Sequence, residues 1–295
     1  MLDFPIVDTH LHLWDPTHLG YPWLDGDPLL NQPYLLPQYN EATQAQPVEK
    51  MVFVQCEVDF AQFMQEVEWV DGLAQQDKRI AGIIPWAPLE HGDAARPVLE
   101  RLAANPRIKG IRRIIQFEAD PDFCLRPDFV QGVQALADYG LSFDICINPL
   151  QMENTIKLVQ QCPEVRFMLD HIAKPDIKHQ VFEPWQTHLR TLAGFENVSC
   201  KMSGLVVEAD WDHWTKEDLK PYIDTVIDCF GFERLAFGGD WPVVLRASHW
   251  QQWLDMLVWA LEGTSQAELR KLFHDNAVAF YRLTELRSIH ASSDA

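Results

Sequence analysis

Eight short apolar runs alternate with helical patterns along the chain, and this alternation constrains the fold more than any other feature. The runs occupy residues 4–13, 51–56, 80–86, 108–115, 141–147, 165–171, 198–205 and 235–241. Runs of this length, bounded by turn residues, are typical of strands buried on both faces of a parallel sheet. Between them apolar residues recur at helical spacing, as at Phe60, Phe63, Met64 and Val67. Strand and helix alternating in this way predict an α/β fold, a (β/α)8 TIM barrel.

The length and composition suit one such barrel. The chain has 295 residues, of which 47% are hydrophobic and 23% charged, as in ordinary globular proteins. Because no linker or low-complexity segment divides it, we expect a single distorted barrel domain over residues 1–285 and a flexible tail at 286–295. The connection at residues 14–46 exceeds the regular spacing and is rich in Pro, Trp and Tyr. We expect it to cover the barrel face at which the strands end.

The net charge limits which classes of partner the protein can bind, and the cysteines indicate the cellular compartment. A formal net charge of -19 argues against nucleic acid and anionic membranes as partners. None of the six cysteines forms a C-x-x-C pair, and several lie in apolar runs, which indicates reduced core residues. The N-terminus lacks a basic segment followed by an apolar stretch, and no run reaches membrane-spanning length. We therefore expect a cytoplasmic protein, either a monomer or a homo-oligomer.

Two histidines in the first predicted strand form the most distinctive local pattern. His10 and His12 are two residues apart, and side chains alternate between the faces of a strand, so both point to the same side. Such a pair suits a metal ion or a small polar centre that needs two imidazoles. Taken alone, the pair fits equally well a polar strand end with two hydrogen-bonded histidines.

Later strand ends supply matching groups. Barrel enzymes place their chemistry at the C-terminal ends of the strands, where His171 follows the sixth run and Asp240 ends the eighth. Each alone would be interpreted as a structural histidine or a turn aspartate. Together with His10 and His12 they predict one catalytic centre, whose four side chains are also the candidate ligands of a metal ion. A carboxylate beside imidazoles is suited to activating water, with or without a metal.

Cations on two strands are the candidate substrate-binding groups. In the fourth run Arg112 shares a face with Gly110, and a glycine suits a crowded barrel interior, so we favour Arg112 over Arg113 as the inward cation. The alternative is that both arginines pair with neighbouring helices. Lys201 lies inside a buried strand and requires a polar partner, which we place at the pocket mouth. Lys109 is included as a further strand-four cation.

Three tryptophans near strand ends are candidates for an apolar floor under a sugar-like ring. They are Trp14, Trp86 and Trp241. Aromatic side chains offer a large apolar surface for such a ring. Ordinary core packing is an equally good interpretation of each.

These residues resemble a known family. The segments that carry the resemblance are 8–14 (DTHLHLW), 109–113 (KGIRR), 169–175 (LDHIAKP), 201–204 (KMSG), 239–242 (GDWP), 275–277 (DNA) and 280–283 (FYRL). They look like the amidohydrolase superfamily, and within it most like the amidohydrolase-2 type sugar lactonases such as L-fuconolactonase and L-rhamnonolactonase. The resemblance implies a distorted (β/α)8 barrel, hydrolysis at an ester or amide carbonyl, and a polar centre made of His10, His12, His171 and Asp240.

One departure from the two-metal members of that superfamily limits the metal content. The fifth run, residues 141–147, contains no histidine, and Lys109 is not accompanied by the ligands of a second metal. We therefore expect at most one divalent ion, with zinc the best-suited metal for imidazole ligands. The lactonase-like branch also implies an alternative, catalysis without a metal.

The resulting hypothesis is a lactonase acting on a small-molecule sugar-acid lactone. Asp240 would take a proton from water, and His10 and His12, directly or through an ion, would stabilise the oxyanion with help from Arg112 or Lys201. Asp240 or His171 would protonate the leaving oxygen. One rival is a metal-dependent decarboxylase of the same superfamily, which would release carbon dioxide. Another is a non-catalytic sugar-acid binding protein, which would bind ligand without turnover.

Overall fold

The eight predicted runs all contain strands. The computed structural model describes residues 2–283, so the expected tail at 286–295 lies outside the described residues. The strands are β1 (Ile6–Leu11), β2 (Val48–Val54), β3 (Ile80–Ile84), β4 (Gly110–Ile111), β5 (Ser142–Ile145), β6 (Phe167–Leu169), β7 (Val198–Met202) and β8 (Leu235–Phe237). Seven of them are shorter than their apolar runs and lie within them, and β4 has only two residues. The exception is β2, which begins at Val48, before its predicted run, and ends at Val54.

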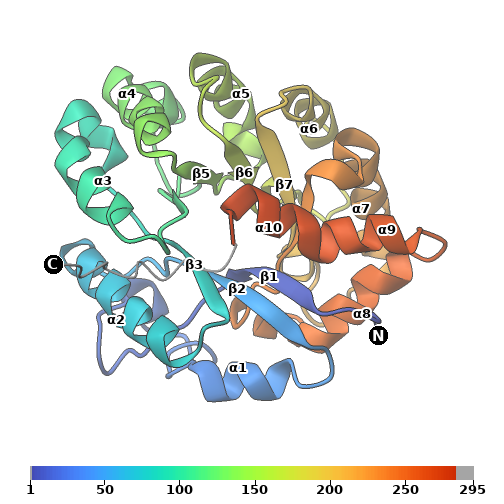
Figure 1. Ribbon diagram of the computed structural model, residues 1–295. Coiled ribbons are helices and arrows are strands. Elements are labelled where there is room, and N and C mark those ends of the chain that lie inside the picture. The colour runs from blue at the N-terminus through green and yellow to red at the C-terminus, as the bar shows by residue number, and fades with distance from the viewer. Residues whose placement is uncertain (1, 284–295) are drawn as a thin grey trace, which may run out of the picture.

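The strands are parallel and form a barrel. They pair in the orders β1-β2-β3 and β4-β5-β6-β7-β8. The two sheets meet at both edges through backbone bridges, Ile83 with Ile108 and Leu11 with Trp241. The prediction of a (β/α)8 barrel is confirmed, and Figure 1 shows its strands ringed by helices.

Helices follow the strands in the predicted alternation. They are α1 (Leu36–Ala42), α2 (Phe63–Gln76), α3 (Arg96–Ala103), α4 (Pro127–Ala135), α5 (Met152–Gln161), α6 (Trp185–Ala193), α7 (Lys216–Phe230), α8 (Trp250–Ala260), α9 (Gln266–Arg270) and α10 (Asn276–Tyr281). Local sequence fixes some of their ends: Thr215 and Asp218 form a capping box at the start of α7. A π-helical turn at Lys271–Asp275 separates α9 from α10. No helix in the described part of the chain is both long and apolar enough to cross a membrane.

The C-terminal helix fills one end of the barrel. Inward-facing strand residues such as Val7, Val52 and Met168 form a cluster with Tyr281 of α10, and Figure 1 shows α10 lying across the barrel. Lys109, which precedes β4, donates to the carbonyl of Arg282 just after this helix, so α10 lies at the end where the strands begin. The opposite end is left for a pocket.

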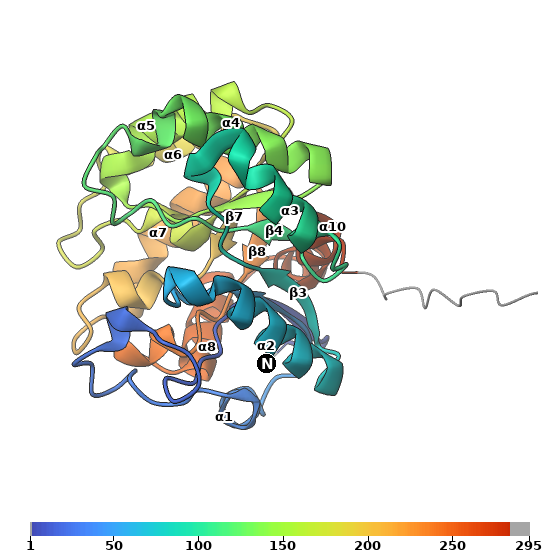
Figure 2. The ribbon, with the colours of Figure 1, turned by 90° about the vertical axis from the view of Figure 1, so that its left-hand side faces the viewer.

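The β1–β2 connection lies at that opposite end. Its backbone folds back on itself where Trp14 pairs with Tyr34, and it contains α1. In Figure 2 this dark blue segment lies on the left, while α10 lies on the right. The expected cover is therefore at the end of the barrel where the strands finish.

Candidate active site

Left-handed backbone turns carry His171 and Asp240 into the barrel mouth. His171 begins a run of four residues, ending at Lys174, whose φ values lie between 50° and 61°, and Asp240 has φ 53°. For residues other than glycine this conformation costs roughly 1–3 kcal/mol each, and such strain is common at functional sites. Gly204 leaves room for the His171 imidazole, since a Cβ on Gly204 would lie 2.6 Å from Nδ1 of His171. A side chain at this glycine would displace the imidazole.

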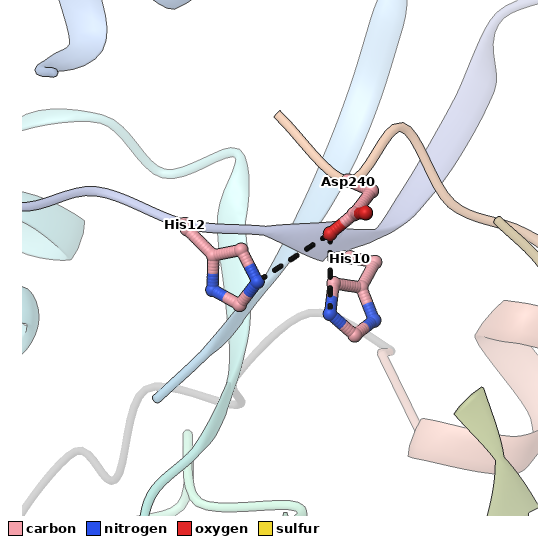
Figure 3. Close-up of side chains that lie close together, drawn as sticks. All are labelled: His10, His12 and Asp240. Carbon is pink, nitrogen blue, oxygen red and sulfur yellow. Dashed lines mark ion pairs between the residues drawn. The ribbon is translucent and has the colours of Figure 1, made fainter. Parts of the chain in front are cut away.

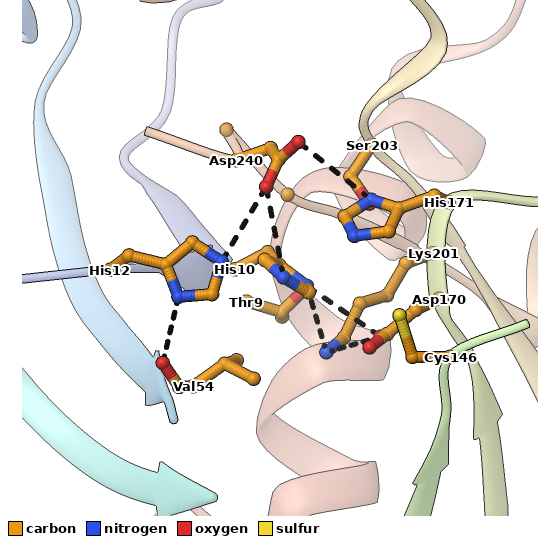
Figure 4. Close-up of polar contacts among 12 residues, drawn as sticks. Thr9, His10, His12, Val54, Cys146, Asp170, His171, Lys201, Ser203 and Asp240 are labelled. Carbon is orange, nitrogen blue, oxygen red and sulfur yellow. Dashed lines mark hydrogen bonds and ion pairs between the residues drawn. The ribbon is translucent and has the colours of Figure 1, made fainter. Parts of the chain in front are cut away.

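Four side chains meet in one polar centre. One oxygen of Asp240 lies 3.6 Å from Nε2 of His12 and 3.8 Å from Nε2 of His10. The other oxygen lies 4.0 Å from Nδ1 of His171. Figure 3 shows the carboxylate facing the imidazoles of His10 and His12, and Figure 4 adds His171 on the other side. All four residues are buried. The structure thus brings together the four residues that the sequence pattern predicted to converge.

Hydrogen-bond partners indicate where His10 and His12 carry their ring protons. Nδ1 of His12 lies 2.8 Å from the carbonyl of Val54, and since a carbonyl only accepts, Nδ1 carries the proton. Nε2 of His10 lies 3.2 Å from Nη1 of Arg112, which only donates. Nδ1 lies 3.5 Å from the Asp170 carboxylate, which accepts, and 3.4 Å from the Lys201 ammonium. The closer donor at Nε2 and the acceptor at Nδ1 together favour the proton on Nδ1. Both rings therefore turn an Nε2 lone pair toward the centre.

The three imidazoles are held in the neutral form. Burial lowers the pKa of His10 well below its usual value, and the nearby Lys201 ammonium adds to this effect. Burial also lowers the pKa of His12, although Asp240 opposes the shift, and lowers the pKa of His171 well below its usual value. Desolvation disfavours a charged ring. Neutral imidazoles can accept a proton or bind a metal.

A buried ionic network supports His10 from below. Nζ of Lys201 lies 2.7 Å from Asp144 and 2.9 Å from Asp170. The hydroxyl of Tyr281 donates to Asp144 at 2.7 Å, and Arg112 lies 3.3 Å from Asp170. Burial alone would raise the pKa of Asp170, but Lys201 and Arg112 outweigh it and hold that pKa below its usual value. The network therefore keeps an anion next to Nδ1 of His10.

A cavity of about 330 Å³ opens onto this centre. His12, His171 and Asp240 form its polar wall together with Arg112, while Trp14, Trp23, Phe117 and Val243 supply apolar walls. Arg112 and Trp14 thus lie where the sequence placed them. The β1–β2 connection contributes Trp14 and Trp23, so it forms part of the pocket wall. Its Tyr21 and Tyr34 are buried instead.

The structure corrects the predicted positions of Lys201 and Lys109. Lys201 was expected at the pocket mouth as a substrate-binding group, but it is fully buried between two carboxylates beneath His10. Lys109 was expected at a strand end, but β4 begins only at Gly110. Lys109 therefore precedes the strand, and its Nζ donates to the carbonyl of Pro106 at 2.7 Å, at the far end of the barrel.

The structure also corrects the predicted role of two of the three tryptophans, which do not form a floor of the cavity. Trp86 stacks on Phe60 with ring centroids 5.1 Å apart. Trp241 packs against Tyr34 and Tyr39 at 5.3 and 5.5 Å. Both serve the packing of the loops around the pocket, since the aromatic residue type does not determine the direction of the side chain.

Several residues of the site were given no role by the sequence interpretation. Asp170 and Ser203 contact His10 and His171, and Lys174 and Glu57 line the cavity. The signal for Asp170 was available: an acid in the sixth apolar run, like Asp144 in the fifth, is the partner that a buried Lys201 requires. Lys174 and Glu57 lie on left-handed backbone at non-glycine residues, which apolar periodicity does not reveal.

Comparisons with known proteins agree with the geometry. A family model described as amidohydrolase matches residues 7–283. An L-fucono-1,5-lactonase of Burkholderia multivorans is 30% identical over 95% of this chain and 96% of its own. An uncharacterized protein, y4mH, of Sinorhizobium fredii is 31% identical over 96% of this chain and its own full length. A crystal structure of a Burkholderia multivorans amidohydrolase with bound zinc has a TM-score of 0.85 at 29% identity and covers 95% of this chain and all of its own.

The chain belongs to the amidohydrolase family. It is a hydrolase, and the relatives with which it aligns over nearly their whole length include proteins named lactonases.

The donor set of the centre fits one divalent ion. Nε2 of His10, Nε2 of His12 and an oxygen of Asp240 form a candidate ligand group whose atoms lie within 4.8 Å of one another. The Asp240 oxygen lies 3.6 Å from Nε2 of His12 and 3.8 Å from Nε2 of His10, close to the roughly 3.3 Å expected between two ligands of a tetrahedral zinc ion. The hydrogen bond from Nδ1 of His12 to Val54 is the contact that usually orients a metal-binding imidazole. Arg112 is the group that competes for the lone pair of His10.

Proposed function

We propose that this protein is a lactonase that opens a sugar-acid lactone by attack of activated water on the ester carbonyl. The observation that carries the proposal is the Asp240 carboxylate, set among three neutral imidazoles at the wall of a cavity. A carboxylate in this position is a general base for a water molecule in the cavity. The finer assignment to L-fucono- or L-rhamnono-lactones is supported by the names of relatives that are 24% to 30% identical.

The first step is proton transfer from water to Asp240. The carboxylate lines the cavity, and its two oxygens face different imidazoles. One oxygen is thus oriented by His10 and His12, while the other lies toward His171. The water attacks the lactone carbonyl as its proton moves to the carboxylate.

Arg112 is the donor best placed to stabilise the oxyanion that develops on the carbonyl. The lone pairs of His10 and His12 face the centre, so neither neutral ring can donate a hydrogen bond there. This revises the expectation that these rings bind the oxyanion directly. Arg112 lines the cavity and carries a permanent charge. A divalent ion held by His10, His12 and Asp240 would add Lewis-acid stabilisation of the same charge.

The leaving ring oxygen takes back the proton that Asp240 removed from water. Asp240 gives this proton either directly or through His171, whose neutral ring can accept it from Asp240 and pass it on. Nδ1 of His171 lies 2.9 Å from the Ser203 hydroxyl, which orients the ring. His171 lines the cavity on the side of Asp240 opposite His12, as Figure 4 shows. A lactone is an activated ester and needs less carbonyl polarisation than an amide, which matches a centre with one carboxylate and one ion or none.

We expect acid release from at least one member of a broad panel of sugar lactones. The panel includes L-fuconolactone, L-rhamnonolactone and galactonolactone, and a pH indicator follows ring opening against the rate without enzyme. Release of carbon dioxide from an acid substrate, with no lactone opened, would favour the decarboxylase instead. Tight binding of sugar acids without turnover would favour the binding protein.

We expect the purified protein to hold at most one divalent ion per chain, with zinc the preferred metal. The physical reason is that His10, His12 and Asp240 form one candidate site. The neighbouring candidate group, His10 with Asp170 and His171, uses the same His10, so the two groups cannot both hold an ion through that residue. Protons compete with a metal for imidazole lone pairs, so occupancy should fall as the pH is lowered. Elemental analysis after dialysis at several pH values measures this. Two ions per chain, or occupancy that rises in acid, would contradict the expectation.

A further inference from the structure

Glu57 is a preorganised carboxylate on the wall of the cavity. It follows β2 with φ 52°, a left-handed conformation at a non-glycine residue. Its backbone N–H donates to Oε1 of Gln55 at 2.6 Å, and Nε2 of Gln55 donates to Oε1 of Glu57 at 2.7 Å. The carbonyl of Gln55 in turn accepts from Nη2 of Arg112 at 2.6 Å. The two reciprocal bonds thus hold Glu57 against Gln55, and the third bond ties Gln55 to Arg112.

Glu57 differs from the cations around the cavity in having no partner of opposite charge within salt-bridge distance among the described residues. Each cation that lines the cavity has an acidic partner: Arg112 pairs with Asp170, Lys174 with Glu208, and Arg246 with Asp27. Glu57 forms no salt bridge among residues 2–283, and its side-chain bond is to the neutral amide of Gln55. An ionised carboxylate accepts about four hydrogen bonds. Glu57 therefore keeps acceptor capacity that a molecule in the cavity can fill.

We propose that Glu57 binds hydroxyl groups of the substrate and makes the cavity selective for neutral, hydroxyl-bearing lactones over lactones with an anionic substituent. This inference rests on the proposed lactonase function. A hydroxyl donates a charge-assisted hydrogen bond to the carboxylate, and two adjacent hydroxyls can each use one lone pair. A carboxylate on the substrate meets a like charge at Glu57, which forms no salt bridge with any cation in the described part of the chain.

The substitution Glu57→Gln separates recognition from loop structure. The glutamine keeps the shape of the side chain and an oxygen that accepts from Gln55, while the backbone bond from residue 57 to Gln55 is unaffected. Only the negative charge and part of the acceptor capacity are removed. A thermal melt checks that the variant is folded.

The experiment measures kcat/KM of wild type and Glu57→Gln on two sets of lactones. One set is neutral and polyhydroxylated, and the other carries a carboxylate, as in glucaro-1,4-lactone. The loss of a hydrogen bond to a charged group predicts a roughly ten- to hundredfold fall in kcat/KM on the neutral set, mainly through KM. On the anionic set we expect kcat/KM to rise. Glu100→Gln, an exposed position on α3, is the matched control and should change neither set.

Lactones that lack single hydroxyls provide a second measurement, whose first part uses wild-type protein alone. Deoxy lactones that lack single hydroxyls should include one that loses the same factor in kcat/KM, and Glu57→Gln should lose nothing further on it. An equal effect of Glu57→Gln on both sets, or no effect, would overturn the role of Glu57 while leaving the lactonase in place. If wild type opens no lactone at all, both proposals fail.

Discussion

Replacing Asp240 by asparagine is expected to lower the turnover rate by on the order of a hundredfold or more, the usual contribution of a general base. The amide fills the same space among the three imidazoles but cannot take a proton from water. Since proton transfer belongs to the transition state, kcat should fall much more than KM changes. Steady-state kinetics on a lactone that wild type opens measures both constants.

A matched control separates this effect from a general effect of losing a carboxylate. Asp228 lies exposed on α7, so Asp228→Asn makes the same chemical change far from the centre and should retain wild-type kinetics. Full activity in Asp240→Asn would remove this residue from its role as the base. The mechanism proposed here would then be wrong.

Replacing Lys201 by methionine is expected to destabilise the fold by roughly 3–5 kcal/mol, the usual cost of breaking a buried ion pair. The ammonium is enclosed by Asp144 and Asp170, and its removal leaves Arg112 as the remaining cation for two buried carboxylates. Urea denaturation measures the free energy of unfolding. Lys78→Met, at an exposed position beyond α2, is the control and should stay within about 0.5 kcal/mol of wild type.

The pH dependence of this loss follows from the same charges. Without Lys201 the pKa values of Asp144 and Asp170 should rise in the folded protein. A carboxyl group with a raised pKa in the folded state binds a proton more readily than it does in the unfolded chain, so the deficit should shrink as the pH falls. Adding Asp144→Asn to Lys201→Met should recover part of the loss. A deficit that grows in acid would argue against unpaired carboxylates as its cause.

The fold could be predicted because strand and helix alternate with little interruption. A buried parallel strand has to be apolar on both faces, so each of the eight strands stands out as a short apolar run. The convergence of His10 and His12 was predicted from the two-residue repeat of a strand, and it holds although β1 ends at Leu11, one residue before His12. His171 and Asp240 followed from the rule that barrel sites lie at strand ends. These inferences depend on periodicity, which a single sequence displays.

The direction of other side chains could not be predicted, because it depends on where each strand begins and ends. The run at 108–115 reads as one strand, yet β4 contains only Gly110 and Ile111, so Lys109 lies before it and Arg112 after it. Lys201 lies within β7, and its depth in the barrel depends on partners that are distant in sequence: Asp144 on β5 and Asp170 directly after β6. Glu57 and Lys174 depend on left-handed backbone that tertiary contacts enforce.

The most direct test of the central claim is the position of a heavy oxygen atom after turnover in water enriched in oxygen-18. Attack of activated water on the ester carbonyl places a single label in the carboxylate of the ring-opened acid and none in the released hydroxyl. Mass spectrometry of the product and its fragments determines the position of the label. The enzymatic reaction has to be fast enough that uncatalysed ring opening contributes little product. Label in the carboxylate is the result that this account predicts. Label in the hydroxyl, or no ring-opened acid from any lactone, would contradict it.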